Sequence, residues 1–461
     1  MSAFYVGTFV SGMCALIFQV AWQRYLMMLV GSEARSISLV VGVFLFGLAM
    51  GYRYWGNRSE RLGSRRRVLA TYGAIELAIG AYAFAFPWLF ARVLAVGRGL
   101  PDHLGVDLAL TSALLLAPTF LMGATIPLLT KALPERPEQA NDFHARVYAV
   151  NTLGACAGAW IGGFWLVPAL GLRASLGVAG VFDVVVGAVF LVGARRVPAA
   201  QGLGAAERPA MSIPNRYPAP VLLLFAAASG AITILFEVLC VRVLSLVVGS
   251  AHYVFPAVVG AFVLGLAVGS LTLARGGTRR LGASRLLREC ALGGAWFALL
   301  YACVPFWINW HVGLRKAFWN ASYEAYLVGL VVVATLALLP GLVFLGRLLP
   351  LTYALVDKKD DDYGRICGGL YFVNTLGTVV GSCLLGHYAL GWLSLDAAFK
   401  LGLGVLAWVV AVGAWYGLEG RARWRAAGSA LVALAVVAWL PRWDRTSYTV
   451  GMFRTSVIRS T

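Results

Sequence analysis

Residues 11–51 read SGMCALIFQVAWQRYLMMLVGSEARSISLVVGVFLFGLAMG, and residues 229–269 repeat this stretch without a gap as SGAITILFEVLCVRVLSLVVGSAHYVFPAVVGAFVLGLAVG. Further along, YAVNTLGACAG from Tyr148 returns as YFVNTLGTVVG from Tyr371. Ten residues of the first stretch recur 218 positions later: Ser11, Gly12, Phe18, Arg24, Gly31, Ser32, Gly42, Phe44, Gly47 and Gly51. A repeat of this length indicates two copies of a whole bundle rather than the short period of a solenoid.

The composition is that of a multi-pass membrane protein. Hydrophobic residues make up 60% of the chain and charged residues only 13%, whereas soluble domains carry about 25% charged residues. Apolar runs long enough to cross about 30 Å of hydrocarbon recur almost end to end. We expect an all-α, major-facilitator-like fold made of a six-helix repeat (1–198), a cytoplasmic linker (199–217), a second six-helix repeat (218–418), and an extra thirteenth helix with a tail (419–461). Because six is an even number, both copies enter the membrane from the same side and are parallel repeats.

The net charge of +18 reflects membrane topology rather than nucleic-acid binding, because the basic residues gather in alternate short loops. Loops 53–67, 274–288 and 420–425 are strongly basic, and the positive-inside rule makes them cytoplasmic. We therefore expect a multi-pass protein of the cell inner (plasma) membrane with a cytoplasmic N-terminus. The side of the C-terminal tail stays open, because its arginines conflict with that rule if the thirteenth helix crosses.

No pattern typical of a metal site, cofactor site or catalytic pair occurs in the sequence. The seven cysteines contain no C-x-x-C and fall mostly in apolar spans, and the five histidines are scattered. We expect no metal, no cofactor and no catalytic residue in this chain.

Three carboxylates, Glu76, Asp183 and Glu237, fall within predicted spans. Charged groups at such depth are costly and normally face a bundle interior or a cavity. They could be neutral, hydrogen-bonded structural groups. Alternatively, they form an acidic cavity for protons or organic cations, whose ammonium groups need an anionic partner once dehydrated.

Other polar residues complete the candidate substrate-binding set. Gln19 on the first span is expected to face Glu237 across the pseudo-twofold axis. Arg24 and its copy Arg242 either line the cavity or extend to the membrane interface. Asn151 and Asn374 open equivalent spans, where each either binds a ligand or bonds a neighbouring helix.

Proline and glycine mark breaks and close contacts at equivalent places in the two halves. The candidate kinks are Pro118, Pro127, Pro340 and Pro350. Paired breaks of this kind indicate a binding site or a moving gate. The G-x-x-x-G pairs at 47–51 and 265–269 predict close helix packing.

The segments SGMCALIFQVAWQRYLMMLVGS, FLFGLAMG, PTFLMGATIPLL and YAVNTLGACAGA together resemble the membrane region of spermidine synthase-like proteins fused to a major-facilitator-like bundle. The loop 56–66, with Glu60, also resembles the cytoplasmic loop that helps to set the relation of the two halves in the major facilitator superfamily. In the fused family a soluble aminopropyltransferase domain follows a junction like the one at 443–453. None of that domain's motifs occurs in this chain, so the resemblance implies polyamine chemistry without supplying a catalytic residue.

Two functions follow from these features. The first is a membrane module in the lipid bilayer that binds or transports a small solute, a polyamine or another organic cation, between its halves. The second is a non-transporting scaffold that anchors a soluble enzyme domain or a partner protein.

Overall fold

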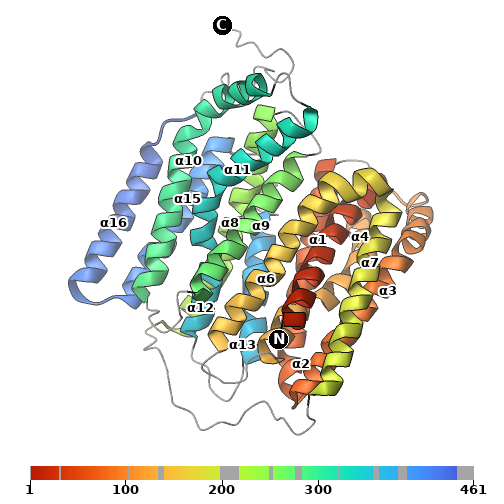
Figure 1. Cartoon of the computed structure of the whole chain (residues 1–461). Helices are drawn as coiled ribbons and strands as arrows, with labels where there is room; N and C mark the ends of the chain where they lie inside the picture. The colour runs from red at the N-terminus through yellow and green to blue at the C-terminus, as the bar shows by residue number, and fades with distance from the viewer. Residues whose placement is uncertain are drawn as a thin grey trace.

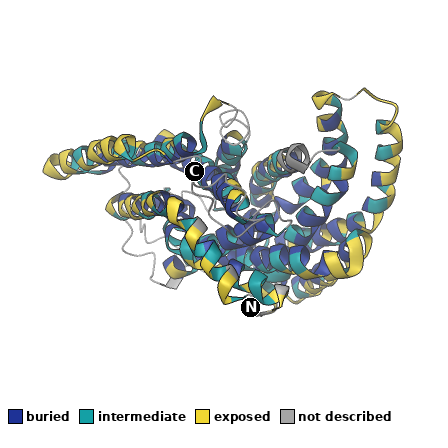
Figure 2. Cartoon of the chain, turned by 90° about the horizontal axis from the view of Figure 1, so that it is seen from above, coloured by how far each residue is buried: buried dark blue, intermediate teal, exposed yellow. Residues whose placement is uncertain are grey.

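The computed structural model describes residues 2–30, 33–101, 103–132, 140–197, 217–248, 253–275, 283–318, 322–356, 363–382 and 392–443. These residues form a bundle of long helices whose outer surfaces are exposed and whose contact faces are buried (Figures 1 and 2). All of the predicted linker except Tyr217 lies outside the described residues, as does the tail from 444 onward.

The N-terminal half consists of α1 (Ser2–Val30), α2 (Glu33–Arg61), α3 (Arg65–Gly97), α4 (Leu104–Met122), α5 (Thr125–Ala132), α6 (Ala140–Trp160), the π-helical segment η2 (Ile161–Leu166) and α7 (Val167–Arg196). The C-terminal half consists of α8 (Ala219–Val248), α9 (Val254–Arg275), α10 (Ala283–Ala317), α11 (Tyr323–Gly346), α12 (Leu348–Leu355), α13 (Tyr363–Val380) and α15 (Leu395–Gly417). The helix that follows is α16 (Gly420–Trp439).

Nine helical segments among the described residues are long and apolar enough to cross a membrane. The longest of them, Asp142–Arg196, has 55 residues and includes α6, η2 and α7. Gly171 adopts φ 76° within this segment, a conformation that residues other than glycine rarely tolerate. The chain reverses there, so that α6 and α7 run in opposite directions (Figure 1).

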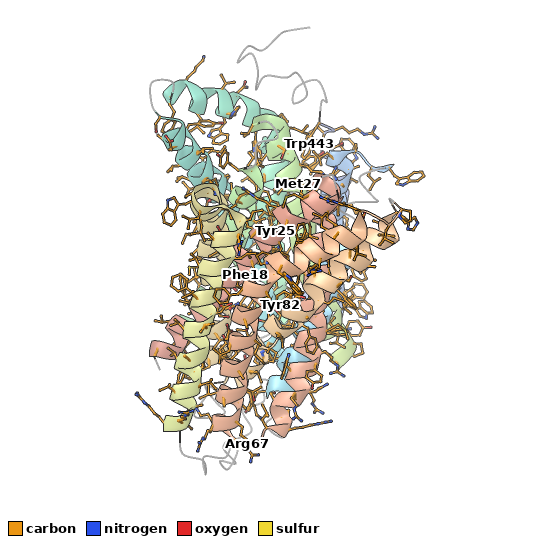
Figure 3. All side chains as sticks on the ribbon, turned by 90° about the vertical axis from the view of Figure 1, so that its right-hand side faces the viewer. Phe18, Tyr25, Met27, Arg67, Tyr82 and Trp443 are labelled. Carbon is orange, nitrogen blue, oxygen red and sulfur yellow. The ribbon has the colours of Figure 1, made fainter. Side chains whose placement is uncertain are left out.

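The two ends of the bundle are named here by one residue each. Arg67, at the start of α3, and Trp443, after α16, lie at opposite ends of the long helices (Figure 3). We call these ends the Arg67 side and the Trp443 side. The helix α1 begins at the Arg67 side, as do α3, α6, α8, α10, α13 and α16 (Figure 1).

The segment after α16 is held firmly against the C-terminal half. Trp443 donates a 3.0 Å hydrogen bond from its indole nitrogen to the Tyr301 carbonyl oxygen, and the two rings stack with centroids 4.7 Å apart. The Tyr301 hydroxyl donates to the Pro441 carbonyl oxygen at 2.7 Å. The described chain therefore ends on the side opposite to the start of α1, which the charge pattern had left open.

Glycines bring helix backbones into contact at equivalent places in the two halves. Gly154 on α6 packs against the Phe9 carbonyl of α1, and Gly377 on α13 packs against the Ala227 carbonyl of α8. Phe9 and Ala227 are 218 positions apart, the spacing of the repeat. The repeat in sequence is thus a repeat of helix contacts.

The packing role predicted for the G-x-x-x-G pairs is confirmed. Gly47 and Gly51 bring α2 against α4, and Gly265 and Gly269 bring α9 against α11. A side chain at any of the four would overlap an atom of the facing helix, as expected of small residues at membrane helix interfaces.

The predicted paired breaks are also present. Pro118 lies within α4, which ends at Met122, and Pro127 is the third residue of α5. In the other half, Pro340 lies within α11, and Pro350 is the third residue of α12. Each pair of helices is therefore one span interrupted at the same place.

Substituting Gly154 with alanine tests the backbone contacts. The added Cβ would come closer than 3.0 Å to the Phe9 carbonyl oxygen, so Gly154→Ala should lower the free energy of unfolding by about 1–3 kcal/mol. The matched control is Gly177→Ala on α7, whose Cβ would meet nothing within 4 Å. Thermal unfolding of the detergent-purified protein is the measurement, and equal melting temperatures for the two variants would contradict the proposed contact.

Candidate functional site

Two membrane-buried carboxylates meet where α3 packs against α7. Glu76 stands in Gly73-Ala-Ile-Glu76-Leu-Ala-Ile-Gly80, and Asp183 stands in Gly180-Val-Phe-Asp183-Val-Val-Val-Gly187. In both, a glycine lies three residues before the acid and another four residues after it. Residues at i−3 and i+4 share the helix face of residue i, so both acids lie on glycine-lined faces.

The two glycine-lined faces pack against each other in antiparallel order. Gly73 meets the Gly187 backbone, and Gly80 meets the Gly180 backbone. The acids between these contacts have no room to turn away, because the helix backbones touch on both sides of them. This spacing in the sequence indicates that Glu76 and Asp183 are partners, and the sequence analysis missed it.

The acid pair is buried and surrounded by neutral groups. Glu76 and Asp183 are each only 1% exposed, and Glu76 lies about 17 Å along α3 from Arg65 at 1.5 Å per residue. Ser11 on α1 donates a 2.8 Å hydrogen bond to Glu76 Oε1. Tyr72 adjoins the Glu76 carboxyl group. Among the described residues, the Asp183 Oδ1 atom has no hydrogen-bond partner.

A cavity of about 180 Å³ opens beside the pair. Besides Glu76 and Asp183, its polar lining consists of Ser11, Thr125, Asn151 and Thr152, and its aromatic lining consists of Phe44, Tyr52 and Tyr148. No Arg, Lys or His belongs to the described lining. The cavity is therefore acidic on one wall and has no internal counter-charge.

The corresponding space in the C-terminal half is almost filled. It measures about 10 Å³ and is lined by Ser229, the repeat counterpart of Ser11, with Cys290 on α10 and Leu406 on α15. Glu289 on α10 does not line this space and forms a 2.9 Å ion pair with Arg347. Of these two spaces in the described residues, only the one in the N-terminal half is acidic.

Four of the sequence-predicted site residues lie away from this cavity. Gln19 and Glu237 are partly exposed, line neither cavity described above, and form no hydrogen bond with each other. Arg24 is partly exposed and Arg242 is exposed. The structure therefore does not bring these four residues together with Glu76 and Asp183.

The two asparagines divide between the alternatives that the sequence left open. Asn151 lines the cavity beside Tyr148, one turn away on the same face of α6. Asn374 donates a 2.9 Å hydrogen bond from its side chain to the Ala226 carbonyl oxygen of α8. The asparagine of the N-terminal half is available to a ligand, and that of the C-terminal half joins two helices.

An aromatic cluster next to the cavity connects the two halves. Tyr52 and Tyr148 line the cavity and contact the ring of Tyr371 on α13, with centroids 5.3 and 5.8 Å apart. His144 stacks on Tyr353 with centroids 4.0 Å apart. The cavity of the N-terminal half is thus bounded by a buried contact with the C-terminal half.

Glu60 holds the halves together at the Arg67 side. Its Oε1 atom accepts hydrogen bonds from the backbone nitrogens of Gly364 at 2.9 Å and Arg365 at 3.1 Å, at the start of α13. Its Oε2 atom pairs with Lys131 at 2.6 Å. A carboxylate at a helix N-terminus is favourable because the first amides and the helix dipole are positive there. We call this arrangement the Glu60 latch.

Comparison with known proteins gives one relative by sequence. A protein of Streptomyces coelicolor described as polyamine aminopropyltransferase 2 is 28% identical over 190 residues, which are 41% of this chain. The match covers 33% of that relative, so the chain spans about a third of its length. No family model matches the chain.

Comparison with solved structures identifies the fold. The chain is similar to a bacterial homologue of the iron transporter ferroportin, with a TM-score of 0.55 at 14% identity, covering 88% of this chain and 98% of that one. It is also similar to the human organic anion transporter MFSD10, with a TM-score of 0.51 at 14% identity and the same coverage of both chains. The expected fold is confirmed: the chain is an all-helical, multi-pass membrane protein with the fold of these two structures.

Removing the carboxylate of Glu60 should open the Arg67 side. The native thiol of Cys367 on α13 is fully buried beside His144, so its alkylation by a maleimide reports opening. Glu60→Ala should raise labelling of Cys367 several-fold. Glu60→Gln, which keeps an oxygen acceptor for the α13 amides, should raise it less.

The exposed Glu324 provides the control, and Glu324→Gln should label as the unchanged protein does. Labelled peptides are assigned by mass spectrometry because the chain has other cysteines. Unchanged labelling of Cys367 in Glu60→Ala would show that the latch does not hold this side closed.

Proposed function

We propose that the chain transports a small organic cation by alternate opening of its two halves, with the cation bound in the cavity beside Glu76 and Asp183. The observation that carries this proposal is the acidic cavity of about 180 Å³ without a basic residue in its described lining. A dehydrated ammonium group needs an anionic partner, and buried carboxylates need a cation. The ammonium group would supply the cation that the carboxylates need, and the carboxylates would supply its anionic partner.

The size and lining of the cavity favour a short aliphatic amine. An apolar cavity of about 150 Å³ holds a benzene molecule, so a diamine such as putrescine is of suitable size. Tyr52 and Tyr148 offer ring faces that attract ammonium groups. The distant likeness to a polyamine aminopropyltransferase supports a polyamine as the solute class.

The framework provides the means for movement. The breaks between α4 and α5 and between α11 and α12 lie at equivalent places, as do the interrupted helices of many transporters. The Glu60 latch joins the halves by polar contacts that can be broken on one side. By the positive-inside rule, we assign the Arg67 side to the cytoplasm.

A second function, a scaffold that positions a soluble partner, is favoured by one observation. Trp443 fixes the segment after α16 to the Trp443 side through its bonds to Tyr301. A domain attached beyond this point would leave the membrane in a defined place. The scaffold requires no solute, which separates it from the first function.

Ligand-dependent stability distinguishes the two functions. Putrescine at about 100 times its dissociation constant should stabilise the protein by roughly 2.7 kcal/mol, seen as a higher melting temperature in detergent. Glu76→Gln and Asp183→Asn should each remove this stabilisation, because each removes a carboxylate of the cavity. Neutral solutes of similar size, such as butanediol, should give no shift.

Glu237→Gln is the matched control, since Glu237 is a carboxylate within a span that does not line the cavity. It should leave the putrescine shift unchanged. A shift lost in Glu237→Gln and kept in Asp183→Asn would move the solute to the site between the halves. A flat response to all amines would favour the scaffold.

A further inference from the structure

We propose that Glu76 and Asp183 hold one proton between them while the cavity contains no cation, and that an entering ammonium group displaces this proton. The protein then exchanges a proton for an organic cation at a single buried site. This inference rests on the proposed function, because it assigns the event that accompanies cation binding there.

The described residues place no counter-charge beside the pair. Among them, Cys14 on α1 and Tyr72 on α3 are titratable side chains that adjoin it. The elements across the cavity contribute Tyr52 from α2 and Tyr148 from α6. All four groups are neutral at ordinary pH, and no basic side chain is found among the described lining residues.

Two ionised carboxylates next to each other are costly in such surroundings. Two carboxylates side by side in a buried site without a counter-charge do not both ionise, and sharing one proton relieves their repulsion. Glu76 Oε1 is occupied by the hydrogen bond from Ser11 at 2.8 Å. Asp183 Oδ1 lacks a partner among the described residues and belongs to a residue that lines the cavity. It is a buried oxygen that lacks a donor within the described part of the chain.

The loss of the proton compensates the charge of the entering ammonium group. Before binding, the pair carries one proton and a net charge of −1. After an ammonium group of charge +1 replaces the proton, the two carboxylates carry −2 and the local total is again −1; the second ammonium group of putrescine brings it to 0. The O–H bond breaks, its proton passes to water, and the electron pair stays on the carboxylate oxygen. The apolar bundle therefore never has to hold an additional net charge.

The two halves differ in the side chains that line their described spaces. The space in the C-terminal half is lined by Ser229, Cys290 and Leu406 and includes no carboxylate. Glu289 is committed to its ion pair with Arg347. Of these two spaces, only the one beside Glu76 and Asp183 offers a carboxyl group for which proton and cation compete, which predicts one proton for each cation bound.

Proton release on binding tests the inference directly. The full chain in detergent is titrated with putrescine by calorimetry in two buffers that differ in ionisation enthalpy, which counts protons released per ligand bound. We expect one proton for each putrescine molecule. The Kd should fall about tenfold for each unit rise in pH wherever the empty pair is singly protonated, by proton linkage.

Two variants locate the proton. Glu237→Gln should keep the release of one proton, because Glu237 lines neither cavity. The double variant Glu76→Gln with Asp183→Asn has no carboxyl group to hold the proton, so any putrescine that it binds should release none. Release of a full proton by the double variant, or loss of release in Glu237→Gln, would overturn the assignment to the pair.

The outcomes separate this inference from the function on which it rests. Putrescine binding without proton release and with a constant Kd would overturn the exchange while leaving a cation-binding protein. Failure of every amine to bind at any pH would overturn both.

Discussion

The backbones of α3 and α7 touch at two glycine pairs, and this contact determines where the acidic site lies. Gly73 packs against Gly187 and Gly80 against Gly180, and Glu76 and Asp183 lie between these two contacts. In a bilayer, where helices gain little from the hydrophobic effect between them, such close contact is a main source of helix association. The same contact that stabilises the N-terminal half therefore also brings its two buried carboxyl groups together.

The two halves share a framework but not a chemistry. Equivalent glycines join α1 to α6 and α8 to α13, and equivalent breaks divide the fourth and tenth spans. The acidic cavity lies in the N-terminal half, while the C-terminal half contributes Tyr371 to its boundary and the first amides of α13 to the Glu60 latch. The N-terminal half thus carries the candidate ligand site, and the C-terminal half forms part of its boundary.

Much of the fold could be predicted from the sequence, because hydropathy and the internal repeat act over long stretches. The broken spans, the close helix contacts and the link from the loop of Glu60 to the other half are all present. The site was harder to predict. Glu76 and Asp183 were both identified, but their pairing depends on which faces of α3 and α7 meet, and Glu237 was grouped with them because depth in the membrane does not specify a helix face. The glycines at i−3 and i+4 of each acid carry that information.

The location of a bound cation tests this account most directly. A structure determined with putrescine at saturating concentration should place an ammonium nitrogen about 3 Å from a carboxylate oxygen of Glu76 or Asp183, the distance of a charge-assisted hydrogen bond. Putrescine found between Gln19 and Glu237, with the cavity of the N-terminal half occupied only by water, would contradict it.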